Sequence, residues 1–135
     1  MNSLYPVICS DTLLPSRDFY VSLFELVPVF DIDWYVQLQS PHDENLQLAF
    51  VDRQHPSVPV HFREVPQGVL VTIELKAVDP VYEKAKSLDL KIELELKDEE
   101  WGQRHFMTVD PNGLLVDVVQ MIQPTQTFLE RHGLA

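Results

Sequence analysis

The spacing of apolar and polar residues changes several times in the first 52 positions. Residues 15–26 place aromatic and leucine side chains at helical spacing, and Pro15 suits a first helical turn. Shorter apolar or alternating runs, typical of strands, occupy residues 4–10, 27–31, 34–39 and 46–51. The pattern predicts the order β-α-β-β-β.

The same order recurs after a polar connection at residues 52–67. We expect a strand at 68–75, a helix at 80–88, strands at 90–96, 101–109 and 114–120, and a terminal helix at 124–132. A shift of 68 positions aligns Asp11 with Asp79 and the first helix with the second. The fold class predicted is α+β, a single domain over residues 1–135 built from modules at about 4–52 and 68–120.

The last two strands are joined by a turn with a clear chemical signature, Asp110-Pro111-Asn112-Gly113. Asp can bond its own backbone, Pro presets φ, and Asn-Gly tolerates positive φ. Because side chains alternate across a sheet, Asp117 shares a face with Leu115 and Val119. A carboxylate in such an apolar run needs a structural or chemical reason.

Alternation also separates two faces of the predicted sheets. One face holds aliphatic rows such as Leu46, Leu48 and Phe50, which we expect beneath the helices. The other face is mixed, and this mixture is typical of a ligand cup with a few polar groups. The candidate ligand-binding residues are Tyr35, Gln37, Gln47, Thr72, Glu74, Trp101, His105, Met107 and Asp117.

The composition of the chain limits the classes of partner that we expect. The 135 residues carry a formal net charge of -11, and no basic patch suited to phosphate backbones is visible, so we expect no nucleic-acid partner. No stretch approaches a membrane span of about 20 apolar residues, and the N-terminus lacks the features of a secretory signal. Cys9, the single cysteine, fits a reducing cytoplasm and is expected to be a small buried thiol rather than a nucleophile.

Several short motifs, in order, resemble the vicinal oxygen chelate superfamily, which includes glyoxalase I, bleomycin-resistance proteins and extradiol dioxygenases. They are Ser10-Asp11, Ser16 to Tyr20, Leu23 to Leu26, Trp101 to Phe106, and the Asp110 turn with Asp117 four places after its glycine. The resemblance implies an incomplete eight-stranded barrel formed by two modules around a cup, and a homodimer.

In the enzymes of that superfamily, His, Glu or Gln side chains hold a divalent metal. Carried over, these positions are Leu4, Leu70 or Thr72, Asp117 and, as the repeat mate of Asp117, Ala49. Leucine and alanine have no lone pair, and stable binding needs about three protein ligands. We therefore expect no metal or other cofactor. A rearranged site from Glu74, His105 and Asp117 is the alternative.

His105 and Asp117 are also the candidate catalytic residues. His105 could act as a general base at neutral pH or form a hydrogen-bonding pocket wall. Asp117 could be an acid or base of raised pKa, a partner of Arg104 or His105, or a solvated residue at the rim. The remaining histidines at positions 42, 55 and 61 lie in loops and are expected to be solvated.

These observations predict a metal-free protein that binds a small aromatic or amphipathic molecule in the cup between modules, as a resistance or sequestration protein does. The alternative is an enzyme: a lyase or dioxygenase with a displaced metal site, or an isomerase using His105 and Asp117.

Overall fold

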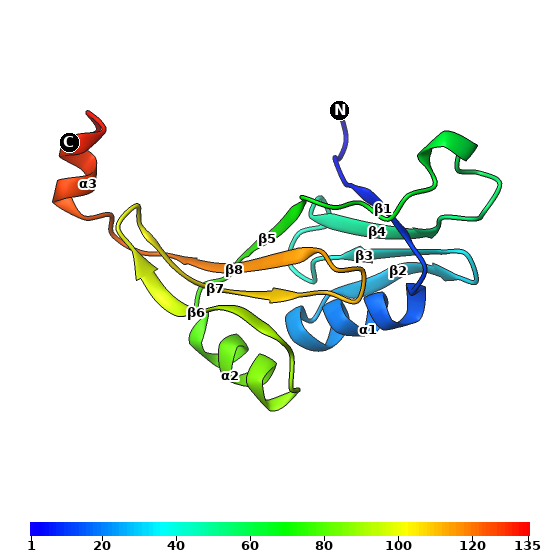
Figure 1. Cartoon of the computed structure of the whole chain (residues 1–135), viewed down its shortest axis with the longest axis horizontal. Coiled ribbons are helices and arrows are strands. Elements are labelled where there is room, and N and C mark those ends of the chain that lie inside the picture. Colours follow the sequence, from blue (N-terminus) through cyan, green and yellow to red (C-terminus); the bar gives the residue numbers. More distant parts are fainter. The chain divides into compact units, whose positions relative to one another are not determined.

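The computed structural model describes residues 1–135, and Figure 1 traces the chain through them. The chain divides into two compact units. The first comprises Met1–Gly68 and Asp110–Leu114, and the second comprises Val69–Val109 and Leu115–Ala135. The division after Gly68 falls where the second sequence module begins.

The first unit is a four-stranded mixed sheet with one long helix. Its elements are β1 (Val7–Ser10), α1 (Leu13–Phe24), β2 (Val27–Ile32), β3 (Tyr35–Gln39), β4 (Gln47–Asp52) and the 3-10 helix η1 (Val60–Phe62). The strand order is β1-β4-β3-β2, with β1 parallel to β4 and the other pairs antiparallel.

The second unit repeats this topology. Its elements are β5 (Leu70–Glu74), α2 (Asp79–Ser87), β6 (Ile92–Glu99), β7 (Gln103–Val109), β8 (Leu115–Met121) and the terminal helix α3 (Gln126–Arg131). The strand order is β5-β8-β7-β6, with β5 parallel to β8. The predicted α+β class and the two β-α-β-β-β modules are confirmed, and each sheet is open rather than closed on itself.

Each unit packs its helix on one face of its sheet, called here the helix face; the other is the far face. In the first unit the Tyr20 ring of α1 lies 5.6 Å from the Phe50 ring of β4. In the second, the Tyr82 ring of α2 lies 5.0 Å from Phe106 of β7. Of the predicted row, Leu48 and Phe50 are core, because burying them removes apolar surface from water, whereas Leu46 is 61% exposed.

The Asp110 turn forms as its sequence predicts. Gly113 has φ +83°, and one carboxylate oxygen of Asp110 accepts hydrogen bonds from the backbone N–H groups of Asn112 and Leu114. The Tyr20 hydroxyl donates to the other oxygen at 2.8 Å. Asp110 is thus buried with its hydrogen-bonding capacity used, as a buried carboxylate requires.

Some boundaries differ from those predicted. Helix α1 begins at Leu13, before Pro15, and Thr12 makes no side-chain cap; the Ser16 hydroxyl instead donates to the Thr12 carbonyl. Strand β6 extends to Glu99, beyond the predicted end at residue 96, and its register with β7 shifts twice. None of the helices combines the length and the hydropathy that a membrane-spanning helix needs.

The repeat is also not a constant shift of 68 positions. Gln37 lies opposite Ala49, and a constant shift would place His105 opposite Asp117. His105 instead lies opposite Val119, and Asp117 opposite Met107. The shift that relates β3 to β7 therefore differs by two residues from the shift that relates β4 to β8. Because two residues is the side-chain period of a strand, the predicted faces are preserved.

Candidate functional site

The structure places the predicted ligand-binding residues in two groups, one on the far face of each sheet. Tyr35, Gln37 and Gln47 lie in the first unit. In the second, Thr72, Asp117 and Met107 form one cross-strand row, and Glu74 and His105 flank Val119 in the next. Trp101 lies in the turn before β7 rather than in the strand.

A hollow of about 380 Å³ lies in the first unit. Three aromatic side chains contribute to it: Phe30, Trp34 and Tyr35. Its other lining residues are Val7, Ile32, Val51, Val58 and Ser57. A mainly apolar lining is typical of sites for small organic molecules.

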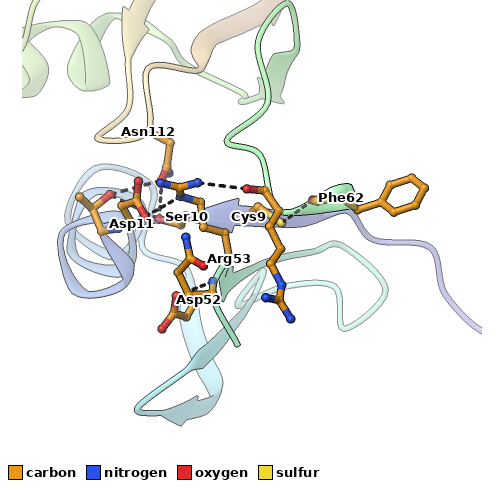
Figure 2. Close-up of polar contacts among 10 residues, drawn as sticks. Cys9, Ser10, Asp11, Asp52, Arg53, Phe62 and Asn112 are labelled. Carbon is orange, nitrogen blue, oxygen red and sulfur yellow. Dashed lines mark hydrogen bonds and ion pairs between the residues drawn. The ribbon is translucent and has the colours of Figure 1, made fainter. Parts of the chain in front are cut away.

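The loop that contributes Ser57 and Val58 is fixed by polar contacts shown in Figure 2. Arg53 donates to Asp11 at 2.7 Å and to the Arg63 carbonyl at 3.1 Å, and Cys9 Sγ contacts the Phe62 carbonyl at 3.5 Å. Arg63 in turn donates to the Val58 carbonyl at 2.8 Å. These contacts position one wall of the hollow.

Cys9 belongs to this support rather than to a reactive centre. It is half-buried, not fully buried as predicted. Burial raises the pKa of its thiol, although nearby Arg53 opposes the shift. Because the thiolate is the nucleophile, a raised pKa disfavours reactivity at neutral pH.

His55 lies in a loop and is partly exposed, as expected, but its ring also stacks on Trp34. The two ring centroids lie 3.6 Å apart with an interplanar angle of 4°. The Nδ1 atom of His55 accepts from the Ser57 backbone N–H at 3.1 Å and lies 2.8 Å from the Ser57 hydroxyl. His55 thus joins Trp34 to Ser57, two residues that line the hollow.

A neutral hydrogen-bond relay crosses the far face of the first sheet. The Tyr35 hydroxyl donates to Gln37 Oε1 at 2.8 Å, Gln37 Nε2 donates to Gln47 Oε1, and Gln47 Nε2 donates to the Glu44 carbonyl at 2.7 Å. Burial raises the pKa of Tyr35, so its hydroxyl stays protonated at neutral pH. The predicted grouping of Tyr35, Gln37 and Gln47 therefore has a physical basis.

The far face of the second sheet carries an ionic relay instead. His105 Nδ1 lies 2.7 Å from Asp117 Oδ1, and His105 Nε2 lies 2.8 Å from Glu99 Oε2. His105 is 2% exposed and Asp117 is 8% exposed. Of the partners considered for Asp117, the structure selects His105; Arg104 instead pairs with Asp79 and Asp98.

The ionic relay sets the protonation of its members. Burial lowers the pKa of His105, but hydrogen bonds to Glu99 and Asp117 outweigh it and raise the pKa overall. The hydrogen bond from His105 lowers the pKa of Glu99 despite burial, and Lys97 at 3.2 Å lowers it further. The raised pKa of His105 favours its imidazolium form, in which both ring nitrogens can donate to the neighbouring carboxyl groups.

Two parts of these arrangements escaped the sequence reasoning. Glu99 lies beyond the predicted strand, so nothing placed it next to His105. The Trp34–His55 stack joins two residues far apart in the chain with no motif between them. Extending β6 by three residues would not by itself have placed Glu99, because the two register shifts of this strand interrupt its alternation.

The family's metal positions do not fit a divalent ion here. Leu4, Ala49 and Leu70 offer no donor atom, Thr72 offers only a hydroxyl group, and Asp117 Oδ1 is engaged by His105. No group of three or more His, Cys, Asp or Glu side chains is arranged to hold a metal. This includes the alternative set of Glu74, His105 and Asp117.

With this geometry in place, comparison with known proteins identifies the family. A family model for the glyoxalase/bleomycin resistance protein/dioxygenase superfamily matches residues 4–118. The chain therefore belongs to this superfamily. No curated protein sequence gave a significant match.

Solved structures of several members have the same fold at low sequence identity. TnmS3, an antibiotic-binding protein from Streptomyces sp. CB03234, is 18% identical with a TM-score of 0.69, over 90% of this chain and 96% of that one. A lactoylglutathione lyase from Agrobacterium tumefaciens is 17% identical with a TM-score of 0.69, and the match covers 87% of this chain and 91% of that one. A superfamily enzyme from Burkholderia phytofirmans PsJN is 12% identical with a TM-score of 0.75, and the match covers 87% of this chain and 97% of that one.

Proposed function

We propose that this chain is a metal-free small-molecule-binding protein of the resistance or sequestration type. The observation that carries the proposal is the hollow on the first sheet, where Phe30, Trp34 and Tyr35 gather in a mainly apolar lining. Such a lining favours an aromatic or amphipathic molecule, because it gains from removing its apolar surface from water.

The chemistry of the second sheet favours binding over acid–base catalysis. Both ring nitrogens of His105 are engaged by carboxylates, so the imidazole has no free nitrogen with which to take a substrate proton. The missing donor atoms at Leu4, Ala49 and Leu70 disfavour a metal-dependent lyase or dioxygenase in the same way.

The structural neighbours are compatible with either class of function. One is an antibiotic-binding protein and another is a lactoylglutathione lyase. An isomerase remains the second candidate, because His105 holds Asp117 at 2.7 Å and would orient its carboxylate as a base. The site on the first sheet decides our preference for binding.

A thermal-shift screen of uncharged aromatic and amphipathic molecules tests the proposal. A ligand that binds only the native state raises the melting temperature. Phe30→Asp, which places a charge in the hollow at a side chain 53% exposed, should abolish the shift given by the best compound. Val27→Asp is the matched control, since Val27 is on the same strand, 44% exposed and outside the hollow.

Two outcomes would count against the proposal. The first is a complete screen without a single stabilising compound. The second is a stabilising compound whose effect is lost equally in Phe30→Asp and Val27→Asp, because the hollow would then have no special part in binding.

We also propose that the protein is a homodimer. Strand β2 is an edge strand whose residues are all exposed, so the outer backbone N–H and C=O groups of this strand are available for pairing. Edge strands with unpaired backbone groups invite pairing unless they are covered. Light scattering at micromolar concentration should give twice the monomer mass of 15.6 kDa, and a mass equal to the monomer would refute this assignment.

A further inference from the structure

Two of the residues that line the hollow, Tyr35 and Ser57, carry hydroxyl groups whose hydrogen-bond roles are fixed by their neighbours. The hydrogen-bond role of the Tyr35 hydroxyl is set at the other end of the relay, by the carbonyl oxygen of Glu44. A carbonyl oxygen only accepts, so Gln47 must present its amide nitrogen to it. Gln47 Oε1 is thereby turned toward Gln37.

The orientation of Gln47 fixes the direction of the next two hydrogen bonds in the relay. Gln37 must offer its nitrogen to Gln47 Oε1, which leaves Gln37 Oε1 facing Tyr35. This oxygen can only accept, so the Tyr35 hydroxyl must donate to it. The hydrogen of Tyr35 is therefore committed within the protein, and only the lone pairs of its oxygen remain for a ligand.

Ser57 reaches the same state by a separate route. The Ser57 backbone N–H can only donate, so the His55 Nδ1 that it contacts at 3.1 Å is an unprotonated acceptor. The Ser57 hydroxyl, 2.8 Å from the same nitrogen, must then donate to it as well. Its oxygen is likewise left as an acceptor.

We propose that the hollow selects planar aromatic molecules that carry a hydrogen-bond donor, such as a phenolic hydroxyl or an aromatic amine. This inference rests on the proposed function and specifies the ligand class. The aromatic lining supplies the surface for the ring: Phe30 and Trp34 lie with centroids 6.0 Å and 5.9 Å from that of Tyr35, at 74° and 60°. Tyr35 and Ser57 supply acceptors for the donor.

A site built in this way discriminates against a molecule that lacks the donor. Such a molecule would displace water from the two hydroxyl oxygens without replacing its hydrogen bonds, and unpaired polar groups in a binding site cost affinity. Among the lining side chains, only the indole N–H of Trp34 could donate to a ligand. The predicted selectivity is therefore tested by comparing a ligand that has a donor with an analogue that keeps the acceptor oxygen but lacks the donor hydrogen.

2-Naphthol and 2-methoxynaphthalene form such a pair, because the methyl ether keeps the ring and the oxygen but has no donor. Isothermal titration calorimetry of the full chain should show 2-naphthol binding about 5-fold more tightly. In the double variant Tyr35→Phe/Ser57→Ala the ratio should fall to about 1, with the affinity for the ether changed less than about 2-fold. Melting temperatures of the variants serve as the folding control.

Each alternative result would overturn the inference in a recognisable way. If wild type binds both compounds equally, or if the double variant keeps the preference, the acceptor assignment is wrong while the binding function stands. If neither naphthalene binds but other compounds stabilise the protein in the screen, the ligand class is wrong. If no compound binds at all, the proposed function itself fails.

Discussion

The far faces of the two sheets share one topology but differ in chemistry. On the first sheet, Tyr35, Gln37 and Gln47 form a neutral relay beside an apolar hollow. On the second, Glu99, His105 and Asp117 form an ionic relay. The same β-α-β-β-β module therefore supports two different ways of satisfying polar groups on a sheet.

The difference suggests a division of roles. The ionic relay satisfies its own charges, because each nitrogen of His105 meets a carboxylate, and this makes the histidine primarily a stabilising group. The neutral relay leaves acceptor lone pairs beside exposed aromatic surface. We therefore assign ligand recognition to the first sheet and expect the second to contribute mainly to stability.

The largest expected effect comes from replacing the centres of the two relays. His105→Ala removes the cation between two shielded carboxylates and should lower the free energy of unfolding by about 3 kcal/mol. Gln37→Ala removes neutral hydrogen bonds on a half-buried site and should cost about 1 kcal/mol. Urea denaturation measures both, and equal losses would break the distinction between the relays.

Only the ionic relay should respond to pH near neutrality. The pKa of His105 is raised in the folded protein above its unfolded value of about 6.5. Its contribution is therefore fully present below about pH 6.5 and is lost as pH rises through the folded pKa. Glu99, whose folded pKa is lowered, contributes above its unfolded pKa of about 4.3 and loses that contribution in acid.

Thermal denaturation in steps from about pH 6 to about pH 9 checks this sign. The melting temperature of wild type should fall as the pH rises, and that of His105→Gln should fall by less over the same range. Gln37→Ala should follow the wild-type profile. A His105→Gln profile parallel to that of wild type would show that His105 does not titrate in this range.

A smaller effect is expected from the stack that supports the hollow. His55→Ala removes a ring that lies 3.6 Å from Trp34 and should weaken binding of 2-naphthol about 3-fold. His55→Phe keeps a stacking ring and should restore part of the loss. His42→Ala, at an exposed loop histidine, is the control. Equal affinities in all three variants would remove His55 from the site.

The smallest expected effect is that of a chelator. Because Leu4, Ala49 and Leu70 supply no donor atoms, treatment with EDTA should leave both the melting temperature and 2-naphthol affinity unchanged. Elemental analysis of protein purified without chelator provides the complementary measurement. Stoichiometric zinc, nickel, manganese or iron, with destabilisation on its removal, would contradict the metal-free proposal.

Much of the fold follows from local patterns in the sequence. The Asp110 turn and the alternating rows of β4 and β8 predict the modules because they depend on nearby residues and on one strand period. They also predict that His105 and Asp117 share a face, which the register confirms. The hydrogen bond between them required a two-residue offset that the sequence repeat did not reveal.

The finer structure of the candidate site depends on contacts that local patterns do not contain. His55 reaches Trp34 through a loop whose course is set by Arg53 and Arg63, and no periodicity describes that loop. Glu99 reaches His105 because β6 continues past its apolar residues into a charged segment. In both cases tertiary contacts outweighed the sequence signal that marks a loop or a strand end.

The most direct test of the assignment to the first sheet is an NMR titration of isotopically labelled protein with 2-naphthol. We expect the largest amide shifts at Phe30, Tyr35 and Ser57, with little change at Asp117. Saturable shifts centred on Trp101, His105 and Asp117, with the first sheet unaffected, would show that the ligand binds the far face of the second sheet and that the assignment to the first sheet is wrong.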